Sequence, residues 1–345
     1  MKLKFLTIIF SIVTLVVAGQ KTQKVGVVAF YNLENLFDTI DGPNDDAEFL
    51  PNGSYGWTAL KYQNKLDNMS KVISQLGDSP DEKIKFNGPT FLGVCEIENR
   101  TVLEDLVNTP LLKDQKYEIV HFDSPDKRGV DVAFLYKGDY FRLLSAKPYL
   151  LLDPEQPDRR TRDQLLVSGI FDGDTLHFIV NHWPSRKAVS EKRVQAAQLC
   201  RSIVDSILNV NVNAKIFVMG DFNDSPVDPS LNWLIHKSEK RKPLTPDVIK
   251  LHNEGFSWHK KGIGTLAHND IWQVFDMIIV SPGVMTDTVG FRFHSASIFD
   301  RPWLHQKEGK FKGYPLRTHA GGTYLNGYSD HLPVYMYIVK DVVKE

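Results

Sequence analysis

The feature that most constrains this chain is a short apolar run that stops at a glycine and is followed at once by ligand-type side chains. The run KIFVM covers residues 215–219 and stops at Gly220, and Asp221 and Asn223 come soon after it. A buried strand that ends in this way presents a carboxylate and an amide at the rim of a sheet, where a ligand can reach them. A simple turn is the alternative, because Asp and Asn form turns readily.

The same pattern recurs along the chain, and its recurrence favours a site over a turn. Other apolar, strand-like runs adjoin side chains that can bind a metal or a phosphate, namely Asn32, Glu34, Glu96, His182, Asp276, Asp330 and His331. The runs themselves cover residues 25–31, 90–94, 175–181, 275–280 and 334–339. A rigid scaffold presents catalytic groups on the rims of its strands. We therefore expect these side chains to gather in one site.

Strand-like and helical segments alternate in both halves of the chain, which indicates a layered fold. Apolar residues at helical spacing predict helices over residues 58–76, 102–112, 190–208 and 230–235. Asp172–Gly173–Asp174 separates two apolar runs and predicts a hairpin. Residues 141–152 are expected to form a further pair of strands, and residues 294–327 are expected to be irregular. The alternation predicts two sheets packed face to face with helices outside.

The first 19 residues are predicted to be a secretory signal peptide. Lys2 and Lys4 form a basic start, an apolar run covers Phe5 to Val17, and Ala18 and Gly19 are small residues suited to cleavage. The run is too short for a comfortable membrane span, although an uncleaved anchor is the alternative. We expect a secreted or periplasmic protein with one domain over residues 20–345 and no transmembrane span after cleavage. No feature indicates an obligate protein partner.

Charge and cysteine content narrow the function classes further. Removal of residues 1–19 takes away two lysines and no acidic residues, which changes the formal charge from −1 to −3. This balance argues against tight non-specific binding of nucleic acid, which needs a basic surface. Cys95 and Cys200 both lie in apolar surroundings, so we expect both to be buried. They could pair in an exported protein, but two cysteines do not define a disulfide framework.

Seven motifs give the chain a family resemblance. FYNLEN, CEIEN, RGVDVAFLY, NHWPSR, GDFND, FDMIIVS and SDHLPV occur in this order between residues 25 and 339. Together they resemble the endonuclease/exonuclease/phosphatase superfamily, which includes DNase I, abasic-site endonucleases, neutral sphingomyelinases and inositol polyphosphate 5-phosphatases. GDFN or SDH alone would be a weak signal, whereas all seven in order are specific. The resemblance implies an α/β (α+β) fold of four layers, with two mostly antiparallel β-sheets packed face to face and flanked by helices.

The resemblance also implies a site for Mg²⁺ or Mn²⁺, for which carboxylate and amide oxygens are suitable ligands. Glu96 matches the family's principal metal-binding glutamate. Glu34 lies where some members place a second metal-binding acid, and Asp330 is expected to bind the metal directly or through water. Asn32 is expected to orient Asp221 or the metal.

The family match assigns catalytic roles to five further positions. Asp221 matches the aspartate that activates the attacking water, and Asn223 matches the amide that holds a phosphate oxygen. His331 matches the catalytic histidine, and Asp276 matches the acid that orients its imidazole and favours the charged form. His182 matches a second histidine, which contacts the phosphate.

Three features match the family less firmly. Arg128 is expected near the substrate, but a structural ion pair between Arg128 and Asp131 is equally consistent with the sequence. Arg186 could bind a phosphate with two hydrogen bonds, and a solvated arginine is the alternative. The aromatic segment His294–Thr318 could be a specificity loop, a membrane-touching element or a folded insertion.

The function expected from the resemblance is hydrolysis of phosphodiesters by a secreted, divalent-metal-dependent enzyme, nuclease-like in its substrate (an endonuclease). The alternative is a phospholipid esterase of the sphingomyelinase kind, or a sugar or inositol phosphate esterase of the same superfamily. A non-catalytic binding protein on the same scaffold is the third hypothesis. That hypothesis would be favoured by loss of Glu96 or His331, and both residues are present.

Export can be tested directly on the native protein. If residues 1–19 are a signal peptide, mass spectrometry of the protein from its natural source will place the N-terminus near Gln20, because cleavage follows the small residues of the leader. Recovery of the full-length chain from the cytoplasm would show that the leader prediction is wrong.

Overall fold

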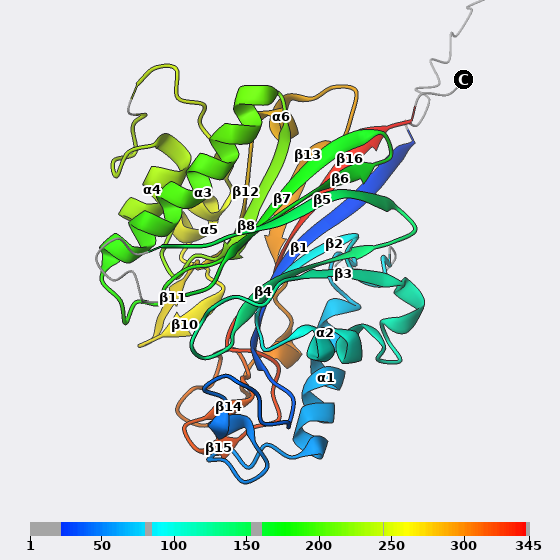
Figure 1. Ribbon diagram of the computed structural model, residues 1–345, viewed down its shortest axis with the longest axis vertical. Helices are drawn as coiled ribbons and strands as arrows, with labels where there is room; N and C mark the ends of the chain where they lie inside the picture. Colours follow the sequence, from blue (N-terminus) through cyan, green and yellow to red (C-terminus); the bar gives the residue numbers. More distant parts are fainter. Residues whose placement is uncertain (1–21, 80–84, 153–160, 244, 343–345) are drawn as a thin grey trace, which may run out of the picture.

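Two six-stranded β-sheets form the framework of the protein (Figure 1). The computed structural model describes residues 22–79, 85–152, 161–243 and 245–342, so the predicted leader lies outside the described residues. In the first sheet β1 and β2 are parallel and the other neighbours are antiparallel. The order of this sheet is β13 (Arg292–Ile298), β16 (Val334–Asp341), β1 (Gln23–Leu36), β2 (Phe91–Ile97), β4 (Asp131–Lys137) and β3 (Tyr117–His121).

The second sheet repeats this mixture of one parallel pair among antiparallel neighbours. Here β7 and β8 are the parallel pair. The order of the sheet is β5 (Phe141–Tyr149), β6 (Gln164–Phe171), β7 (Asp174–His182), β8 (Lys215–Asp221), β12 (Asp276–Val280) and β9 (His252–Asn253). The hairpin predicted around residues 172–174 is β6–β7. Residues 141–152, however, do not form a strand pair, because β5 is a single strand that takes β6 as its partner.

The two faces of β1 explain why its sequence is continuously apolar. Val28 and Phe30 pack into the core between the sheets, whereas Val27 and Ala29 pack with helices on the outer face. Successive side chains of a strand point to opposite faces, so a strand covered on both sides carries no polar alternation. In the core between the sheets, the Phe178 ring of β7 lies 4.7 Å, centroid to centroid, from the rings of Phe91 and Phe134 in the first sheet.

Helices cover the outer faces of both sheets (Figure 1). The helices α1 (Ala59–Ile73) and α2 (Arg100–Val107) pack on the first sheet. Both begin at residues whose side chains accept a backbone N–H, as Asn99 Oδ1 does from Val102 N at 3.0 Å. The second sheet is covered by α3 (Ser190–Val210), α4 (Pro229–His236), α5 (Gly255–Lys260) and α6 (Pro282–Thr286). The predicted four-layer sandwich is thereby confirmed.

Short elements complete the chain, and several lie where the sequence predicts irregular structure. The hairpins are β10 (Leu266–His268) with β11 (Ile271–Gln273), and β14 (His319–Ala320) with β15 (Thr323–Tyr324). The 3-10 turns are η1 (Ala47–Phe49), η2 (Lys113–Gln115) and η3 (Pro302–Leu304). The prediction that residues 294–327 are irregular is wrong at its start, because β13 is an edge strand. Its partly buried residues lack the apolar alternation that would have revealed it.

Two further expectations concern burial and membranes. Cys95 and Cys200 are both buried and both free, so they do not form a disulfide. Among the described helices, none has the length and apolar character needed to span a membrane.

The strand directions bring the ligand-type residues to one edge of the sandwich. The strands β1, β2, β7 and β8 end there, and β12 and β16 begin there because they run antiparallel to β8 and β1. Within the second sheet, Asp221 lies opposite both His182 and Asp276 in the strand register. Residues that are more than 100 positions apart in the sequence therefore meet at this edge.

Candidate active site

A histidine and two aspartates form the most buried part of the site. His331 Nδ1 lies 2.7 Å from Asp276 Oδ2, and His331 Nε2 lies 3.9 Å from Asp221 Oδ2. Burial by itself lowers the pKa of His331, but the carboxylates of Asp276 and Asp221 raise this pKa well above its usual value of 6.5. The imidazole is therefore a cation at neutral pH, with its Nε2–H directed away from Asp276.

Asp221 is held by donors from both sheets. Asn32 Nδ2 donates to its Oδ2 at 3.1 Å, and the backbone N–H of Asn223 donates to its Oδ1 at 2.9 Å. Burial raises the pKa of Asp221 to about 7, and the charges of Asp276 and Glu96 act in the same direction while His331 opposes them. Asn32 is thus placed to orient Asp221, as the sequence suggests. A carboxyl group with a pKa near 7 can accept a proton at neutral pH.

Asn223 stands beside Asp221 in an uncommon backbone conformation. Its φ is 51°, in the left-handed region that residues other than glycine seldom adopt. The side-chain amide donates to the carbonyl oxygen of Trp183 at 3.0 Å. Trp183 is 1% exposed and packs edge-on against Phe222. Trp183 therefore fixes this turn as part of the core.

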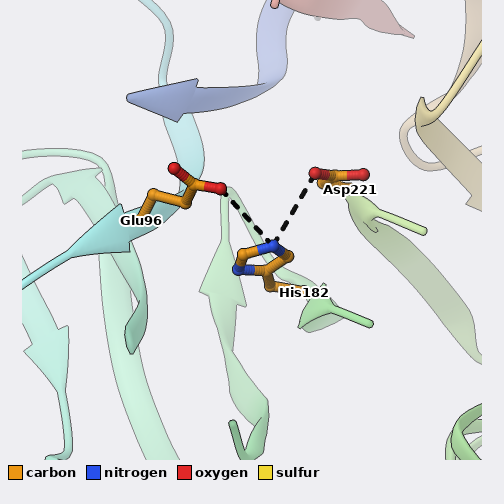
Figure 2. A group of neighbouring side chains, drawn as sticks. All are labelled: Glu96, His182 and Asp221. Carbon is orange, nitrogen blue, oxygen red and sulfur yellow. Dashed lines mark ion pairs between the residues drawn. The ribbon is translucent and has the colours of Figure 1, made fainter. Parts of the chain in front are cut away.

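Glu96 and His182 face Asp221 from neighbouring strand ends, as Figure 2 shows. His182 Nε2 lies 3.7 Å from Glu96 Oε1 and 3.8 Å from Asp221 Oδ2. Glu96 also has a left-handed backbone, with φ of 57°, and its Oε2 accepts the backbone N–H of Asn35 at 3.2 Å. Left-handed residues cost energy and are kept where the surrounding structure needs them. The strained conformation lies at the end of β2, where the glutamate meets His182.

Arg162 belongs to the site and was missed in the sequence. Its Nη2 lies 3.2 Å from His182 Nε2, and its Nη1 donates to Asp126 Oδ2 at 3.1 Å. A guanidinium group can only donate, so His182 Nε2 accepts and the proton of the imidazole lies on Nδ1. Burial, then Arg162 and Arg128, lower the pKa of His182 well below 6.5. The one sequence signal was a cluster of three arginines in residues 159–162, which also suits a solvated loop.

Glu34 lies at the end of β1, but its carboxylate is occupied by the protein. Its Oε1 accepts from Arg317 Nε at 2.8 Å, and its Oε2 accepts from the backbone N–H of Thr318 at 2.8 Å. Arg317 also pairs with Asp330, at 3.0 Å between Nη2 and Oδ2. This geometry favours a structural role for Glu34, which ties the chain before β16 to β1. Metal binding by Glu34 and Asp330 stays a prediction.

Lys65 of α1 is a further cation in this network, and it is buried. Its side chain is 0% exposed, and its Nζ donates to Thr318 Oγ1 at 2.7 Å and to the Tyr328 carbonyl at 2.6 Å. Its Nζ is 4.0 Å from Glu34 Oε2. Burial lowers the pKa of Lys65 to about 8 and raises the pKa of Glu34 to about 7. A buried ammonium with these partners holds the segment 318–328 against α1.

The remaining predicted arginines lie near the site, but with partners of their own. Arg186 pairs with Asp228 at 2.9 Å, and its guanidinium carbon lies 4.5 Å from the centre of the Phe275 ring. It is therefore not simply solvated. Arg128 is exposed and close enough to lower the pKa of His182. The alternative pairing of Arg128 with Asp131 is not what forms, because Asp131 bonds His121 at 2.9 Å.

The donor set around Glu96 fits a divalent cation. One ligand atom each from Glu96, His182 and Asp221 lies within 4.8 Å of the others. The separations in Figure 2 are longer than hydrogen bonds. Two carboxylates suit Mg²⁺ or Mn²⁺, and a neutral imidazole adds a nitrogen ligand. Within the described residues, neither Glu96 nor Asp221 has an ion pair at hydrogen-bonding distance, because their separations from His182 and His331 are 3.7 to 3.9 Å.

Sequence comparison identifies the family of this chain. The family model described as "Endonuclease/Exonuclease/phosphatase family" matches residues 27–340, which is nearly the whole of the described chain. A sequence search of curated proteins gives no match.

Solved structures with the same fold are numerous but distant in sequence. An endonuclease/exonuclease/phosphatase family protein from Bacteroides thetaiotaomicron is 18% identical with a TM-score of 0.56, over 93% of this chain and 100% of the other. A mannosyl-6-phosphatase of the same organism is 18% identical with a TM-score of 0.54, over 92% and 99%. TDP2 of D. rerio, complexed with a single-strand DNA product, is 12% identical with a TM-score of 0.54, over 91% and 98%. These likenesses concern the fold.

The buried lysine generates a stability prediction. Lys65→Met leaves Glu34 without its buried cation and removes the hydrogen bonds from Nζ to Thr318 and Tyr328, so we expect a loss of about 3 kcal/mol in the free energy of unfolding, measured with urea. The exposed Lys113→Met is the control and should change little. The double variant Lys65→Met/Glu34→Gln should lose less than the sum of the single losses, because the two groups interact. Additive losses would show that Lys65 does not act through Glu34.

Proposed function

Because the chain belongs to the endonuclease/exonuclease/phosphatase family, we propose that it is an exported enzyme that hydrolyses phosphoric esters with the help of Mg²⁺ or Mn²⁺. The observation that carries this proposal is the buried row of His331, Asp276 and Asp221 facing Glu96 at one edge of the two sheets. A base, a cationic hydrogen-bond donor and a carboxylate that can hold a metal are groups that hydrolysis at phosphorus can use.

Asp221 is the residue proposed to take the proton of the attacking water. Its carboxylate is fixed by Asn32 and by the backbone of Asn223, so its free lone pairs have a defined direction. Hydrolysis forms a bond between the water oxygen and phosphorus and breaks the bond between phosphorus and the ester oxygen. The proton from water passes to Asp221, and the leaving alcohol needs a proton in return. The pKa of about 7 suits this exchange near neutral pH.

His331 is proposed to stabilise the negative charge that grows on the phosphoryl group and its leaving oxygen. Asp276 holds the imidazole by Nδ1, so Nε2–H is the group that faces the centre. A preorganised donor in a site with little water acts on developing charge more strongly than it would in water. Asp276 therefore works through His331 by orientation and by keeping the ring charged.

A divalent cation, when bound, supplies Lewis acidity that polarises a phosphoryl oxygen. Glu96 would hold it, with Asp221 and His182 as the nearest further donors. Arg162 donates to Asp126 and His182, and its buried Nε has no hydrogen-bond partner in the described structure, so Arg162 is proposed to donate to a phosphate oxygen. The side chain of Asn223 is proposed to contact the same group.

The substrate of this chemistry is the finer part of the proposal. Three arginines around the centre are paired with carboxylates: Arg162 with Asp126, Arg186 with Asp228 and Arg317 with Glu34. Nucleic acids are polyanions, and proteins hold them chiefly with cations that the phosphates neutralise. The pairing and the acidic mature charge therefore favour a small ester over a long nucleic acid. The nuclease-like activity expected from the family resemblance stays a prediction.

The metal site can be tested with one substitution. Glu96→Gln keeps the size of the side chain but removes its charge, so we expect Mn²⁺-stimulated hydrolysis of bis(p-nitrophenyl) phosphate to be lost. The rise in melting temperature that Mn²⁺ gives the wild-type protein should also be lost, because a ligand that binds only the folded state stabilises it. Glu104→Gln, on the exposed face of α2, is the matched control. Full activity of Glu96→Gln at saturating metal would disprove the assignment.

The histidine–aspartate pair gives a kinetic prediction. His331→Ala should lower kcat by roughly 10² to 10⁴, the range for a lost acid–base or electrostatic group. Asp276→Asn should cause a related loss, because the imidazole loses its orientation and its preference for the charged form. The double variant should be little worse than His331→Ala, since groups that act as a unit are not additive. Fully multiplicative losses would mean that Asp276 does not act through His331.

A further inference from the structure

A cavity of about 480 Å³ opens beside Asp330, the residue that directly precedes His331. One wall is the β10–β11 hairpin, with Leu266 and Asp270, and the other is the loop before β14, with Gln306, Phe311 and Tyr314. Arg317 and Asp330 also line it. The volume lies in the range of about 300–1,000 Å³ that is typical of small-molecule sites. This cavity could not be predicted from the sequence, because its two walls are about 40 residues apart and neither has a regular spacing of apolar residues.

The walls of the cavity are bonded to the catalytic pair. Thr265, which precedes Leu266, accepts the backbone N–H of Asp276 at its Oγ1 (3.2 Å) and the backbone N–H of Leu332 at its carbonyl (2.6 Å). Asp330 lines the cavity and directly precedes His331 in the chain. A molecule in this cavity would therefore lie close to the segment that carries His331, on the side of Asp330.

The two walls are also bonded to each other. Tyr314 Oη donates to Asp270 Oδ1 at 2.8 Å, and the backbone N–H of Asp270 donates to Tyr314 Oη at 2.6 Å. The Phe311 ring packs at a tilt against the Tyr314 ring, with 5.5 Å between the centroids. The cavity thus has a fixed aromatic side rather than a loose loop, and aromatic side chains offer large apolar contact surfaces.

The polar groups of the cavity are balanced in charge. Lys310 and Arg317 stand against Asp270 and Asp330, and Arg317 is already bonded to Asp330 at 3.0 Å. A polyanion would need cations that are free to neutralise it. Carboxylate, amide and guanidinium groups beside an aromatic wall instead suit an uncharged ring that carries hydroxyl groups, since hydroxyls both donate and accept. A lipid chain would find too many polar groups here to desolvate.

We propose that this cavity binds the alcohol part of the substrate and that this part is a single hydroxyl-bearing ring of monosaccharide size. The substrate class is then a sugar phosphate ester, and hydrolysis with one water releases the sugar alcohol and the phosphate. This assignment rests on the proposed function of the neighbouring centre. It gives the aromatic segment 294–318 a role in specificity, through Gln306, Phe311 and Tyr314.

The test compares esters that differ only in the alcohol. Hydrolysis of D-glucose 6-phosphate and D-mannose 6-phosphate, and of their methyl diesters, is measured with Mg²⁺ or Mn²⁺ against methyl phosphate and dimethyl phosphate. We expect kcat/KM for at least one hexose ester to exceed that of the matched methyl ester by about tenfold or more. A single-stranded DNA oligonucleotide, bis(p-nitrophenyl) phosphate and sphingomyelin vesicles complete the panel.

Two variants then ask whether the cavity causes this preference. Phe311→Ala removes an apolar contact surface of the cavity, and Gln306→Ala removes a hydrogen-bonding amide. Each should raise KM for the hexose ester about tenfold while kcat changes less. Tyr140→Ala is the control, because Tyr140 is also an exposed aromatic residue (62%) and lies at the opposite end of β4 from the site. Melting temperatures confirm that each variant is folded, and either variant alone suffices for the test.

The outcomes separate this inference from the function on which it rests. Hydrolysis of bis(p-nitrophenyl) phosphate without any preference for a hexose ester would overturn the sugar assignment and leave the proposed function standing. A preference for DNA or for sphingomyelin would do the same. A hexose preference that Phe311→Ala and Gln306→Ala leave unchanged would place the sugar elsewhere. Failure to hydrolyse every ester with either metal would overturn both proposals.

Discussion

The constraint on which the site depends is the burial of two carboxylates beside one imidazole. Asp221 and Asp276 face each other across β8 and β12, and both are at most 2% exposed. Two like charges out of water repel each other and lose hydration, so at least one needs a cation or a proton. His331 supplies the cation from the other sheet, at 2.7 Å from Asp276 and 3.9 Å from Asp221. The pair therefore joins the two sheets as well as preparing the chemistry.

The strand ends of the site could be predicted from the sequence because local pattern and topology agree there. Each apolar run gives way to ligand-type residues near the same edge of the sandwich, so Asn32, Glu96 and Asp221 mark that edge without knowledge of the partners. The residues that could not be predicted act through loops. Arg162 reaches His182 from a polar segment, and Arg317 reaches Glu34 across 283 positions. The local sequence gives no information about such contacts, because an arginine that pairs with a distant carboxylate and a solvated arginine occur in similar polar segments.

The aromatic segment before β16 is a second case in which the role of each residue could not be predicted from the sequence. Phe299 is fully buried and Trp303 packs beside Tyr328, with 5.0 Å between the ring centroids, so these rings belong to the core of the first sheet. Phe311 and Tyr314 instead line the cavity beside the centre. Phe299, Trp303, Phe311 and Tyr314 all lie in one stretch of similar composition, and only their neighbours distinguish packing from a binding surface. The sequence therefore predicts an aromatic loop, but it does not show which of the aromatic residues pack in the core and which line the cavity.

The two histidines of the site, His331 and His182, differ in protonation state because their surroundings differ. His331 lies against carboxylates, which raise its pKa and hold it as a cation, whereas burial, and then Arg162 and Arg128, lower the pKa of His182 and keep it neutral. Environments that push the pKa values of like groups apart assign different roles to them. The charged ring can only donate, which suits developing negative charge. The neutral ring keeps one lone pair on Nε2, which faces Glu96 and Asp221. This lone pair accepts from Arg162 here and would serve a metal in place of Arg162. A site with two imidazolium groups would lose that nitrogen ligand, so the burial of His182, with Arg162 beside it, keeps the two sides of the centre chemically distinct.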